Sequence, residues 1–437
     1  MTLQGGMPAE RLPPRIYNLF PRLVGEMPRW PQHARRAHGM GFDWLLLNPI
    51  HFPGFSGSCY AVKDYERVDP ILLPAAHPDR HYDEKVRADG GMELLAETLQ
   101  AVREAGMRPM IDLVLNHTSR DAILVREHPE WYRVDAEGNI TSPSAIDPAD
   151  ARRVTVWGDL AQLDHSESSA REALWSFWVE RVERYVDLGF EGFRCDAAYK
   201  VPAALWRRVI DAARRRNPNV LFLAETLGAR AEEVDALRES GMEYLFNSSK
   251  YWAFDTTWCL EQQRDLGSCM RSVGFPESHD TPRLWAETGG NEAVQRQRFA
   301  FAAAFSSAAL MPIGYEFGFR RALHVVHTRP EDWEEESVDL TSFIRRVHEI
   351  CWSVDAFLGE TVTNRTPLDR PTLLLERRGS DAPAWIAINK DWESSQSLTL
   401  PEEARGRRFL RVCIEIAAEE SAARELQLAP AEVAYIL

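Results

Sequence analysis

The chain has 437 residues, a formal net charge of −15 and 45% hydrophobic residues. This length allows one large domain and a small one, and the negative charge argues against nucleic acid or an anionic membrane surface as a partner. No apolar run approaches the roughly 20 residues of a transmembrane helix, and residues 1–6 lack the pattern of a signal peptide. We therefore expect a cytoplasmic protein without nucleic-acid or membrane partners; the sequence leaves its oligomeric state open.

Eight strand candidates alternate with helical stretches through the first three quarters of the chain. They are 16–20, 43–47, 109–114, 192–194, 220–223, 244–246, 272–275 and 311–314. Segments between them, such as 92–102, carry apolar residues at helical spacing. Eight strand-then-helix units predict an α/β fold, specifically a closed (β/α)8 TIM barrel.

Two regions depart from this alternation. The connection between the third and fourth strands is rich in Pro, Asp and Gly and is far longer than the usual connection of about 2–6 residues, so we expect a short inserted lobe there. After about residue 356, short strand candidates separated by turn residues predict a small antiparallel β domain. The predicted division is 1–116 with 188–355 for the barrel, 117–187 for the lobe and third helix, and 356–437 for the C-terminal domain.

Four short motifs place carboxylates and an arginine near the ends of separate predicted strands. They are DLVLNH at 112–117, GFRCD at 192–196, LAET at 223–226 and ESHD at 277–280. In a parallel barrel the carboxyl ends of all strands meet at one face, where active sites are built. Asp196, Glu225 and Asp280 are therefore expected to share one pocket.

Three carboxylates in one pocket suit the cleavage of a glycosidic bond. Cleavage with retention needs two carboxyl groups about 5–5.5 Å apart, one on each side of the anomeric carbon. Asp196 is the candidate nucleophile, because Arg194 lies two residues earlier on the same strand face and a guanidinium favours an ionised carboxylate. Glu225 ends an apolar strand, where burial would raise its pKa and suit it to acid/base catalysis.

The remaining members of the motifs fit contacts with the same sugar ring. Asp280 would hold two hydroxyl groups and help to distort the ring, and His117 and His279 could donate hydrogen bonds to hydroxyls. Any one of the carboxylates alone is explained equally well by a strand-end cap or a salt bridge. The complete set, in barrel order, is what indicates catalysis.

These four motifs resemble regions one to four of glycoside hydrolase family 13, the α-amylase superfamily, and the resemblance covers most of the chain. It implies a barrel, a lobe inserted after the third strand and a C-terminal β domain. It also places Asp196 at the nucleophile position, Glu225 at the acid/base position and Asp280 at the position of the transition-state stabiliser. The family's companion positions fall on Arg194, His117 and His279.

Further substrate contacts are expected on the same face. Residues 57–65 resemble the family's segment after the second strand, where Tyr60 would stack on the sugar in subsite −1. Other candidates for substrate binding are Asp64, Lys200 and Arg283. Lys200 could contact a sugar or a phosphate beyond the cleaved bond, or it could be a solvated surface lysine. Five aromatic residues after the sixth strand could stack on an acceptor sugar or form core: Phe246, Tyr251, Trp252, Phe254 and Trp258.

The chain departs from the family pattern in places that bear on metal binding and specificity. Ser278 stands where region four usually has Asn, a change that also occurs in branching enzymes. Gln162 replaces the Asp of the family's lobe motif, and Tyr199-Lys200 stand where many calcium-dependent amylases have a histidine ligand. Asn116 alone does not supply the roughly 6–8 oxygen ligands that calcium takes. We therefore expect no calcium, no other metal and no cofactor.

The predicted function is cleavage of α-glucosidic bonds in α-glucans or malto-oligosaccharides through a covalent β-glycosyl-enzyme on Asp196. The leading hypothesis is a retaining hydrolase of the α-amylase or α-glucosidase type, on the grounds of its frequency. The alternative is an α-glucan glycosyltransferase of the maltosyltransferase or transglucosidase type, since residues 41–51 resemble a stretch of bacterial maltosyltransferases that use maltose 1-phosphate. A catalytically inactive sugar-binding module is a remote alternative, because all three carboxylates are present.

Overall fold

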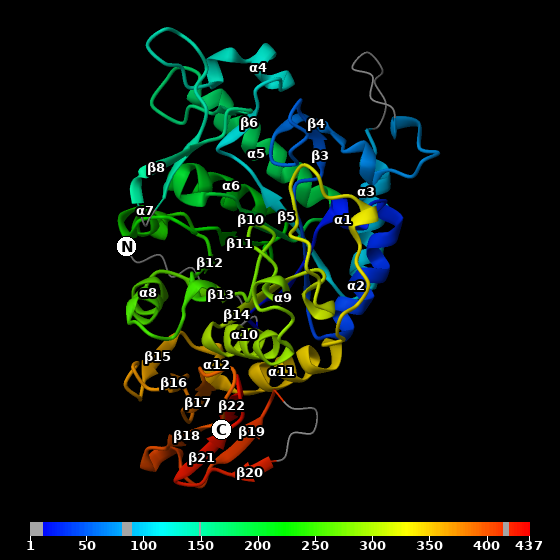
Figure 1. Ribbon diagram of the computed structural model, residues 1–437. Coiled ribbons are helices and arrows are strands. Elements are labelled where there is room, and N and C mark those ends of the chain that lie inside the picture. Colours follow the sequence, from blue (N-terminus) through cyan, green and yellow to red (C-terminus); the bar gives the residue numbers. More distant parts are fainter. Residues whose placement is uncertain (1–11, 81–89, 148–149, 414–418) are drawn as a thin grey trace.

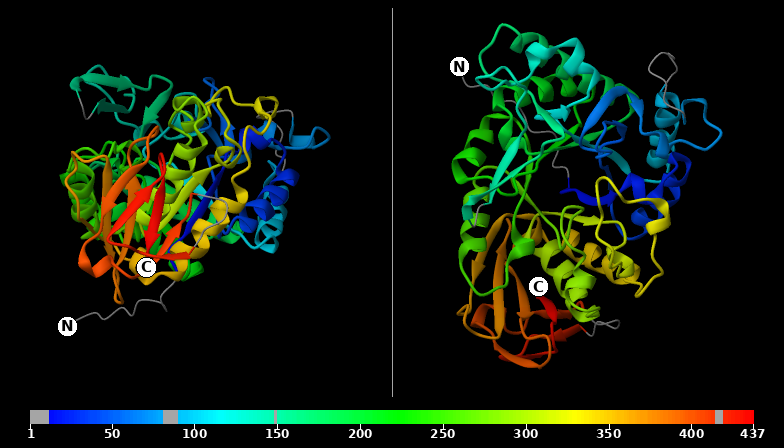
Figure 2. Two further views of the ribbon diagram at one scale, coloured as in Figure 1. Left: turned by 60° about the horizontal axis from the view of Figure 1, so that its bottom comes forward. Right: turned by 45° about the horizontal axis from the view of Figure 1, so that its top comes forward.

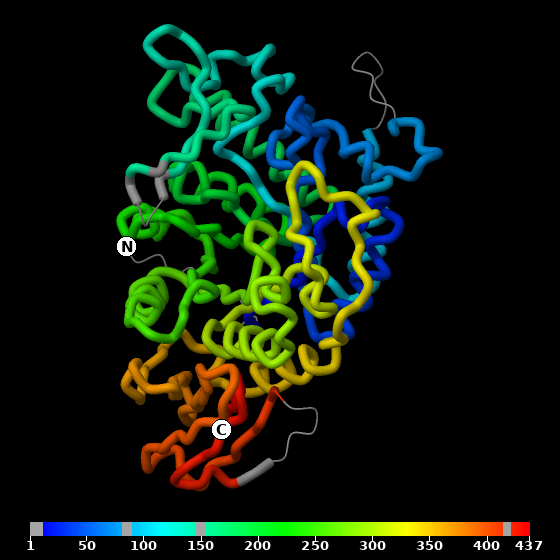
Figure 3. The backbone as a smooth tube through the Cα atoms, in the orientation of Figure 1, coloured from blue at the N-terminus to red at the C-terminus, as the bar shows by residue number. Residues whose placement is uncertain are grey.

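The computed structural model describes residues 12–80, 90–147, 150–413 and 419–437; the stretch 1–6 lies outside this range. Figure 1 and the backbone tube of Figure 3 show a central barrel between a lobe and a C-terminal β domain. The views in Figure 2 agree that the lobe and the β domain lie on opposite sides of the barrel.

Eight parallel strands close the barrel in the order β1-β14-β13-β12-β11-β10-β5-β2, which confirms the predicted fold class. Each predicted strand overlaps one of them. Their bounds are β1 Arg15–Leu19, β2 Trp44–Leu47, β5 Arg108–Leu113, β10 Gly192–Cys195, β11 Leu221–Ala224, β12 Tyr244–Phe246, β13 Arg271–Gly274 and β14 Ala308–Pro312.

Helices between the strands surround the barrel (Figure 1). In α6, the side chains that lie buried recur at helical spacing, and Arg214, Arg215 and Arg216 stand at the negative end of the helix dipole. Within the described ranges, no helix is both long enough and apolar enough to cross a membrane. The helices are α1 Pro21–Val24, α2 Trp30–Gly39, α3 Met92–Glu104, α5 Arg171–Leu188, α6 Ala203–Arg216, α7 Ala231–Ala236, α8 Trp258–Gly267, α9 Leu284–Glu287, α10 Glu292–Phe305, α11 Thr341–Ser353 and α12 Asp355–Leu358.

The barrel interior is apolar in its lower layer and polar at its carboxyl end. Trp44 and Met110 pack inside it, and a Cβ on Gly192 would come within 2.7 Å of the Trp44 ring and 2.8 Å of the Met110 Cε atom. Glycine at the start of β10 therefore makes room for the indole. Nearer the carboxyl ends the interior holds buried polar side chains, including Asn18 and Arg194. This change in polarity fixes the end at which chemistry can occur, which we call the barrel mouth.

Two insertions rise at the barrel mouth. After β2, strands β3 (His51–Pro53) and β4 (Val62–Val68) form an antiparallel pair. After β5, the expected lobe contains two antiparallel pairs and a short helix, and α5 then leads into β10. The lobe elements are β6 His117–Ser119, α4 Ile123–Glu127, β7 Ser144–Asp147, β8 Asp150–Val156 and β9 Leu160–Gln162.

The C-terminal domain is antiparallel, as the sequence predicts. Its six-stranded sheet has the order β15-β16-β17-β22-β19-β20, and β18 pairs with β21 beside it. The strands are β15 Thr361–Asn364, β16 Thr372–Arg378, β17 Ala384–Asn389, β18 Gln396–Thr399, β19 Arg408–Arg411, β20 Glu419–Ser421, β21 Glu425–Leu428 and β22 Val433–Ile436.

A buried arginine joins this domain to the barrel helices. Arg377 of β16 has no exposed surface, and its guanidinium donates to the carbonyl oxygens of Phe305, Phe357 and Gly359. These oxygens lie at or just beyond the C-terminal ends of α10 and α12, where backbone carbonyls lack helical partners. The positive charge also matches the negative ends of both helix dipoles.

We expect Arg377→Met to lower the free energy of unfolding by about 2–4 kcal/mol, because it leaves three buried carbonyl oxygens without a donor. Urea unfolding followed by circular dichroism measures the change. Arg378→Met is the matched control, because the neighbouring Arg378 side chain is 56% exposed and pairs with Glu376. Equal losses in both variants would contradict the role given to Arg377.

Candidate active site

The site is organised around the guanidinium of Arg194. Its Nη1 atom donates to both oxygens of Asp112 at 2.9 Å and to Asp196 Oδ1 at 2.7 Å. Its Nη2 atom lies 4.0 Å from Glu225 Oε2. These side chains come from β5, β10 and β11, which are hydrogen-bonded neighbours, so their carboxyl ends place the four groups together. One buried cation thus contacts three carboxylates.

Asp112 is a site residue to which the sequence motifs assigned no role. Its side chain is fully buried, and it accepts a hydrogen bond from the Tyr60 hydroxyl at 2.6 Å in addition to those from Arg194. Burial raises the pKa of Asp112 to about 6, against the opposing effect of Arg194. The sequence feature that could have identified Asp112 is its position as the first residue of the motif 112–117, on the strand that pairs with the strand of Arg194.

Glu225 has the properties of a proton donor near neutral pH. Burial raises the pKa of its carboxyl to about 7, which the neighbouring Arg194 only partly offsets. The backbone N–H groups of Leu227 and Ala197 donate to its two oxygens at 2.6 Å and 3.0 Å, which fixes the carboxyl plane. A catalytic acid works best when its pKa lies near the working pH. These properties fit the acid/base role that was predicted for Glu225.

The backbone after Asp196 adopts a conformation that is unusual for its residue type. Ala197 has φ +41° and ψ +48°, in the left-handed region, and this turn directs its N–H towards Glu225. A residue with a Cβ atom held in this region costs about 1–3 kcal/mol, and such strain gathers at functional sites. The turn links the candidate nucleophile to the candidate acid/base through one peptide group.

Tyr60, His279 and Asp280 form the opposite part of the cluster. The Tyr60 hydroxyl lies 2.7 Å from His279 Nε2 and accepts from Asn48 Nδ2 at 3.1 Å, and the Tyr60 and His279 rings are stacked with centroids 5.8 Å apart. His279 Nε2 is also 3.0 Å from Asp280 Oδ2. Contacts with Asp112, Asn48 and His279 therefore fix the position of the Tyr60 ring. The expected stacking of Tyr60 on a sugar stays a prediction.

The pair His279–Asp280 favours opposite charges. Burial would lower the pKa of His279, but Asp280 raises it above its ordinary value. Enclosure at the barrel mouth would raise the pKa of Asp280, but His279 and Arg194 together bring it down to about 2. The Asp280 side chain, 52% exposed, is thus a carboxylate that can meet a ligand at all relevant pH values.

His117 lies in the same region with both ring nitrogens free of protein partners among the described residues. The side chain is buried, and burial lowers its pKa although Asp196 acts in the opposite direction, so the ring is neutral. A buried imidazole without a partner is costly unless a ligand or water satisfies it. This placement fits the hydroxyl contact that the motif predicts.

The other three predicted contacts lie in different surroundings. Lys200 is exposed, with its Nζ atom 4.9 Å from the ring centroid of Tyr199. Asp64 accepts from the backbone N–H of Glu66 at 2.8 Å and pairs with Arg67, so these contacts stay within its own hairpin.

Arg283 is buried rather than open at the barrel mouth, and the substrate contact expected of it stays a prediction. Its side chain is 1% exposed and donates to Glu277 Oε1 at 2.8 Å and to the carbonyl of Arg321 at 3.1 Å. Glu277 in turn accepts from the Leu284 backbone N–H at 2.6 Å. Glu277 therefore joins both ends of the loop that carries Asp280, since it precedes that loop and accepts hydrogen bonds from Arg283 and Leu284 after it.

The aromatic residues after β12 divide into two groups. Phe246, Trp252 and Phe254 are buried and belong to the core, as one of the two interpretations proposed. Tyr251 is 57% exposed and Trp258 is 36% exposed. Only these two of the five remain available for a ligand.

The residues at the family's calcium positions do not fit a calcium ion. Gln162 Oε1 is 3.5 Å from the Thr141 hydroxyl, and the backbone carbonyl of Asn116 already accepts from the N–H of Leu163 at 3.0 Å. Lys200, in the segment after region two, carries a positive charge. Among the residues that the structure describes, no group of three His, Cys, Asp or Glu side chains could hold a metal. Independence of calcium stays a prediction.

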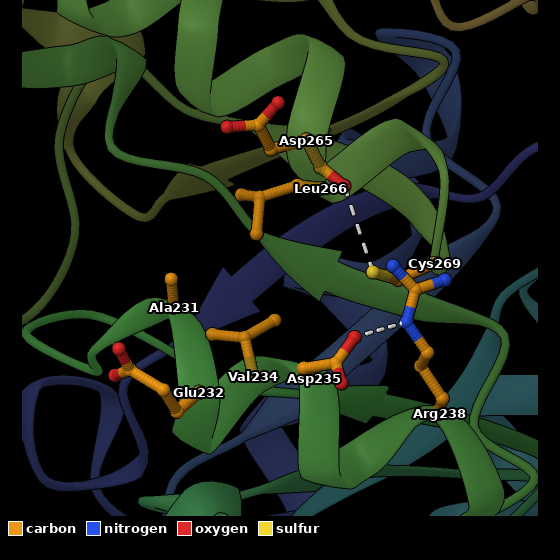
Figure 4. A pocket seen from close by; sticks show the side chains of 8 residues that line it. All are labelled: Ala231, Glu232, Val234, Asp235, Arg238, Asp265, Leu266 and Cys269. Atoms are coloured by element: carbon orange, nitrogen blue, oxygen red, sulfur yellow. Dashed lines mark hydrogen bonds and ion pairs between the residues drawn. The ribbon is translucent and has the colours of Figure 1, made fainter.

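A groove of about 400 Å³ lies away from this cluster, between α7 and α8 in the outer layer (Figure 4). Arg238 pairs with Asp235 there, and the Cys269 thiol donates to the carbonyl of Asp265 at 3.5 Å. None of the catalytic candidates lines it, so its size does not make it the active site. Its lining residues are Ala231, Glu232, Val234, Asp235, Arg238, Asp265, Leu266 and Cys269.

Comparisons with known proteins agree with the motifs. Residues 8–143 match the family model for the glucanotransferase domain of glycogen debranching enzyme. A relative named alpha-1,4-glucan:maltose-1-phosphate maltosyltransferase, from Burkholderia pseudomallei, is 26% identical over 394 residues, covering 86% of this chain and 33% of the relative. The chain spans between 32% and 59% of the length of the curated maltosyltransferases it matches.

Solved structures share the fold. An alpha-amylase from Lactobacillus plantarum superposes with a TM-score of 0.75 at 19% identity, over 97% of this chain and 99% of that one. A protein described as an alpha-glucosyl transfer enzyme superposes with a TM-score of 0.74 at 15% identity, over 98% and 99%. The chain is therefore similar, in fold and in its motifs, to enzymes of the α-amylase superfamily.

The protonation of Glu225 gives a test by pH. Its acid form is present below pH 7 and is lost above it, so kcat/KM for malto-oligosaccharides should fall about tenfold per pH unit above the pKa. A glycosyl fluoride donor needs no protonation of its leaving group, so its glycosylation rate should lack this decline. Initial rates with both donors from pH 5 to 9, chosen to span the pKa of about 7, provide the measurement. The same decline for both donors would contradict the assignment of Glu225 as the acid.

The strained backbone gives a second test. Ala197→Gly should leave the free energy of unfolding unchanged or raise it by up to about 1 kcal/mol, because glycine adopts the left-handed conformation without strain. Ala198→Gly is the control: Ala198 is buried with an ordinary φ, so we expect a loss of about 1 kcal/mol. Thermal unfolding distinguishes the two, and a clear loss for Ala197→Gly would show that no strain is stored there.

Proposed function

We propose that the chain is a retaining α-glucan glycosyltransferase of the maltosyltransferase or transglucosidase type. The observation that carries the chemistry is the meeting of Asp196 and Glu225 at one guanidinium, with Asp196 in direct contact and Glu225 protonated near neutral pH. Retention needs two carboxyl groups, one that attacks the anomeric carbon and one that donates a proton to the leaving oxygen. The donor would be an α-configured glucosyl or maltosyl compound, and the acceptor an α-linked glucan.

The reaction proceeds in two steps that use the same pair of groups. Asp196 attacks the anomeric carbon while the Glu225 proton passes to the leaving oxygen. This gives a β-glycosyl-enzyme and either a free saccharide, from a glucan donor, or inorganic phosphate, from a sugar 1-phosphate. The hydroxyl of an acceptor sugar then attacks the same carbon, Glu225 takes its proton, and the bond to Asp196 breaks. The charge that develops on the ring between these states is met by the carboxylate of Asp280.

Transfer is favoured over hydrolysis by the names of the relatives. Curated relatives from several bacteria are named maltosyltransferases, and neighbours in structure include a trehalulose synthase and an alpha-glucosyl transfer enzyme. The hypothesis of a hydrolase, which led from the sequence alone, therefore gives way to its alternative. The donor by analogy with the relatives is maltose 1-phosphate, and the acceptor an α-1,4-glucan.

Time-resolved proton NMR with maltoheptaose, with and without orthophosphate, tests this proposal. We expect redistribution of chain lengths without a net gain of reducing ends, and a phosphate-dependent sugar 1-phosphate if phosphate serves as a substrate. A steady gain of α-configured reducing ends would identify a hydrolase instead.

The nucleophile is tested separately. Asp196→Asn should lower either activity roughly 10⁴-fold, because an amide does not form the glycosyl ester. Its unfolding temperature should match that of the unaltered protein within a few degrees, since the amide oxygen can still accept from Arg194. Turnover by this variant at the original rate, with contamination excluded, would contradict the assignment.

A further inference from the structure

The segment 247–258, which joins β12 to α8 at the barrel mouth, is firmly held. Asn247 Nδ2 donates to Ser306 Oγ at 2.7 Å and to Gln263 Oε1 at 3.1 Å, and the Ser249 hydroxyl donates back to Asn247 Oδ1 at 2.7 Å. All these groups are buried. The first turn of the segment is therefore a fixed platform rather than a free loop. We call residues 247–258 the β12 loop.

The middle of the β12 loop is held from two further sides. Trp252 is fully buried, and Arg298 donates to its carbonyl at 2.8 Å while the guanidinium lies 4.4 Å from the ring centroid of Phe254. Lys390, from the C-terminal domain, donates to the carbonyl of Phe254 at 3.2 Å. Phe254 itself has φ +66°, a strained value for a residue with a Cβ atom. Such strain persists only where the surroundings fix it.

One large side chain of this fixed turn points outward. Tyr251 is 57% exposed between buried Ser249 and buried Trp252. Lys250 beside it is paired with Glu287 at 3.1 Å, and its Nζ atom lies 5.7 Å from the centroid of the Tyr251 ring. An exposed aromatic ring on a rigid backbone loses little entropy when it takes up a ligand.

The position of Tyr251 is set by the loops that carry two catalytic candidates. Glu287 ends α9, the helix that follows Asp280, so the pair with Lys250 joins the β12 loop to that loop. On the other side, the hydroxyl of Thr226, next to Glu225, donates to the carbonyl of Phe246 at 2.7 Å. The pKa of the Tyr251 hydroxyl is raised by partial burial first and then by Asp280, Glu225 and Glu287.

We propose that Tyr251 is the aromatic platform on which the acceptor sugar stacks. This inference rests on the proposed transfer of a glycosyl unit. Glu225 serves the leaving oxygen first and the acceptor oxygen second. The bond from Thr226 to Phe246 holds the start of the β12 loop against the strand end that carries Glu225, so a ring on this loop can meet the saccharide on that side of the cleaved bond. The apolar face of a glucose unit packs on an aromatic ring, and the hydroxyls at its edge remain free for the carboxylates. By binding the acceptor, Tyr251 favours attack on the glycosyl-enzyme by a sugar hydroxyl over attack by water.

The test compares Tyr251→Ala and Tyr251→Phe with the unaltered enzyme, using α-maltosyl fluoride as donor and maltotriose as acceptor. Fluoride release measures the total rate, and chromatography of the products divides it into transfer and hydrolysis. We expect Tyr251→Ala to raise the KM for maltotriose and lower the ratio of transfer to hydrolysis, each about tenfold. Tyr251→Phe should keep both within about twofold, because it retains the ring. Formation of the glycosyl-enzyme, observed by mass spectrometry, should be equal in all three.

Trp392→Ala is the control for loss of an exposed aromatic side chain, because Trp392 is 43% exposed and lies in the C-terminal domain. It should leave the ratio unchanged. An unchanged ratio in Tyr251→Ala would overturn the platform while leaving the transferase standing. A wild-type enzyme that forms the glycosyl-enzyme yet passes it only to water would overturn the proposed transferase and the platform together. Thermal unfolding of each variant excludes loss of fold.

Discussion

The constraint on which the site depends is one buried guanidinium shared by three carboxylates. A single positive charge cannot compensate three negative charges in a closed interior, so the carboxyl groups compete for it. Asp196 lies 2.7 Å from Arg194, whereas Glu225 lies 4.0 Å away, and Glu225 and Asp112 keep protons to higher pH. Asp112 has a raised pKa although it lies 2.9 Å from Arg194, so burial rather than distance is the main cause of both shifts. Burial raises the pKa of Glu225 to about 7 and so gives the site a proton donor near neutral pH.

The rest of the barrel mouth keeps that geometry in place. Tyr60 joins Asp112 to His279, so a hydrogen-bonded series runs from Arg194 to the pair His279–Asp280. The loop that carries Tyr60 is itself fixed by Arg22, whose buried guanidinium pairs with Asp69 at 2.8 Å and also donates to the carbonyls of Gly57 and Val325. Tyr60 and Arg22 lie outside the four motifs, so the motifs alone do not make the site.

The local sequence predicts those features that depend on neighbouring residues, such as the strands and the carboxylates at their ends. The eight strands and the C-terminal sheet follow from residue patterns, and a carboxylate that ends a strand keeps that place in the barrel. The role of Asp112 depends on pairing with Arg194 across 82 residues, which no single stretch of sequence shows. Arg283 and Glu277 are close in sequence, but the burial of their pair depends on the surrounding fold. The positive φ of Ala197 is hidden for a similar reason: alanine signals no such turn, and only the surroundings impose it.

Hydrolases and transferases differ in what reaches the same intermediate, so the distinction lies outside the catalytic cluster. The β12 loop contains none of the four motifs. Its conformation depends on Arg298 in α10 and on Lys390 of the C-terminal domain. That domain does not contribute a group to the cluster around Arg194. Through Lys390 it nevertheless fixes the backbone next to Tyr251, so a domain remote from the chemistry can help to decide which acceptor receives the sugar. The residues for bond cleavage lie in the barrel, whereas contacts between the barrel and the C-terminal domain can influence the choice of acceptor.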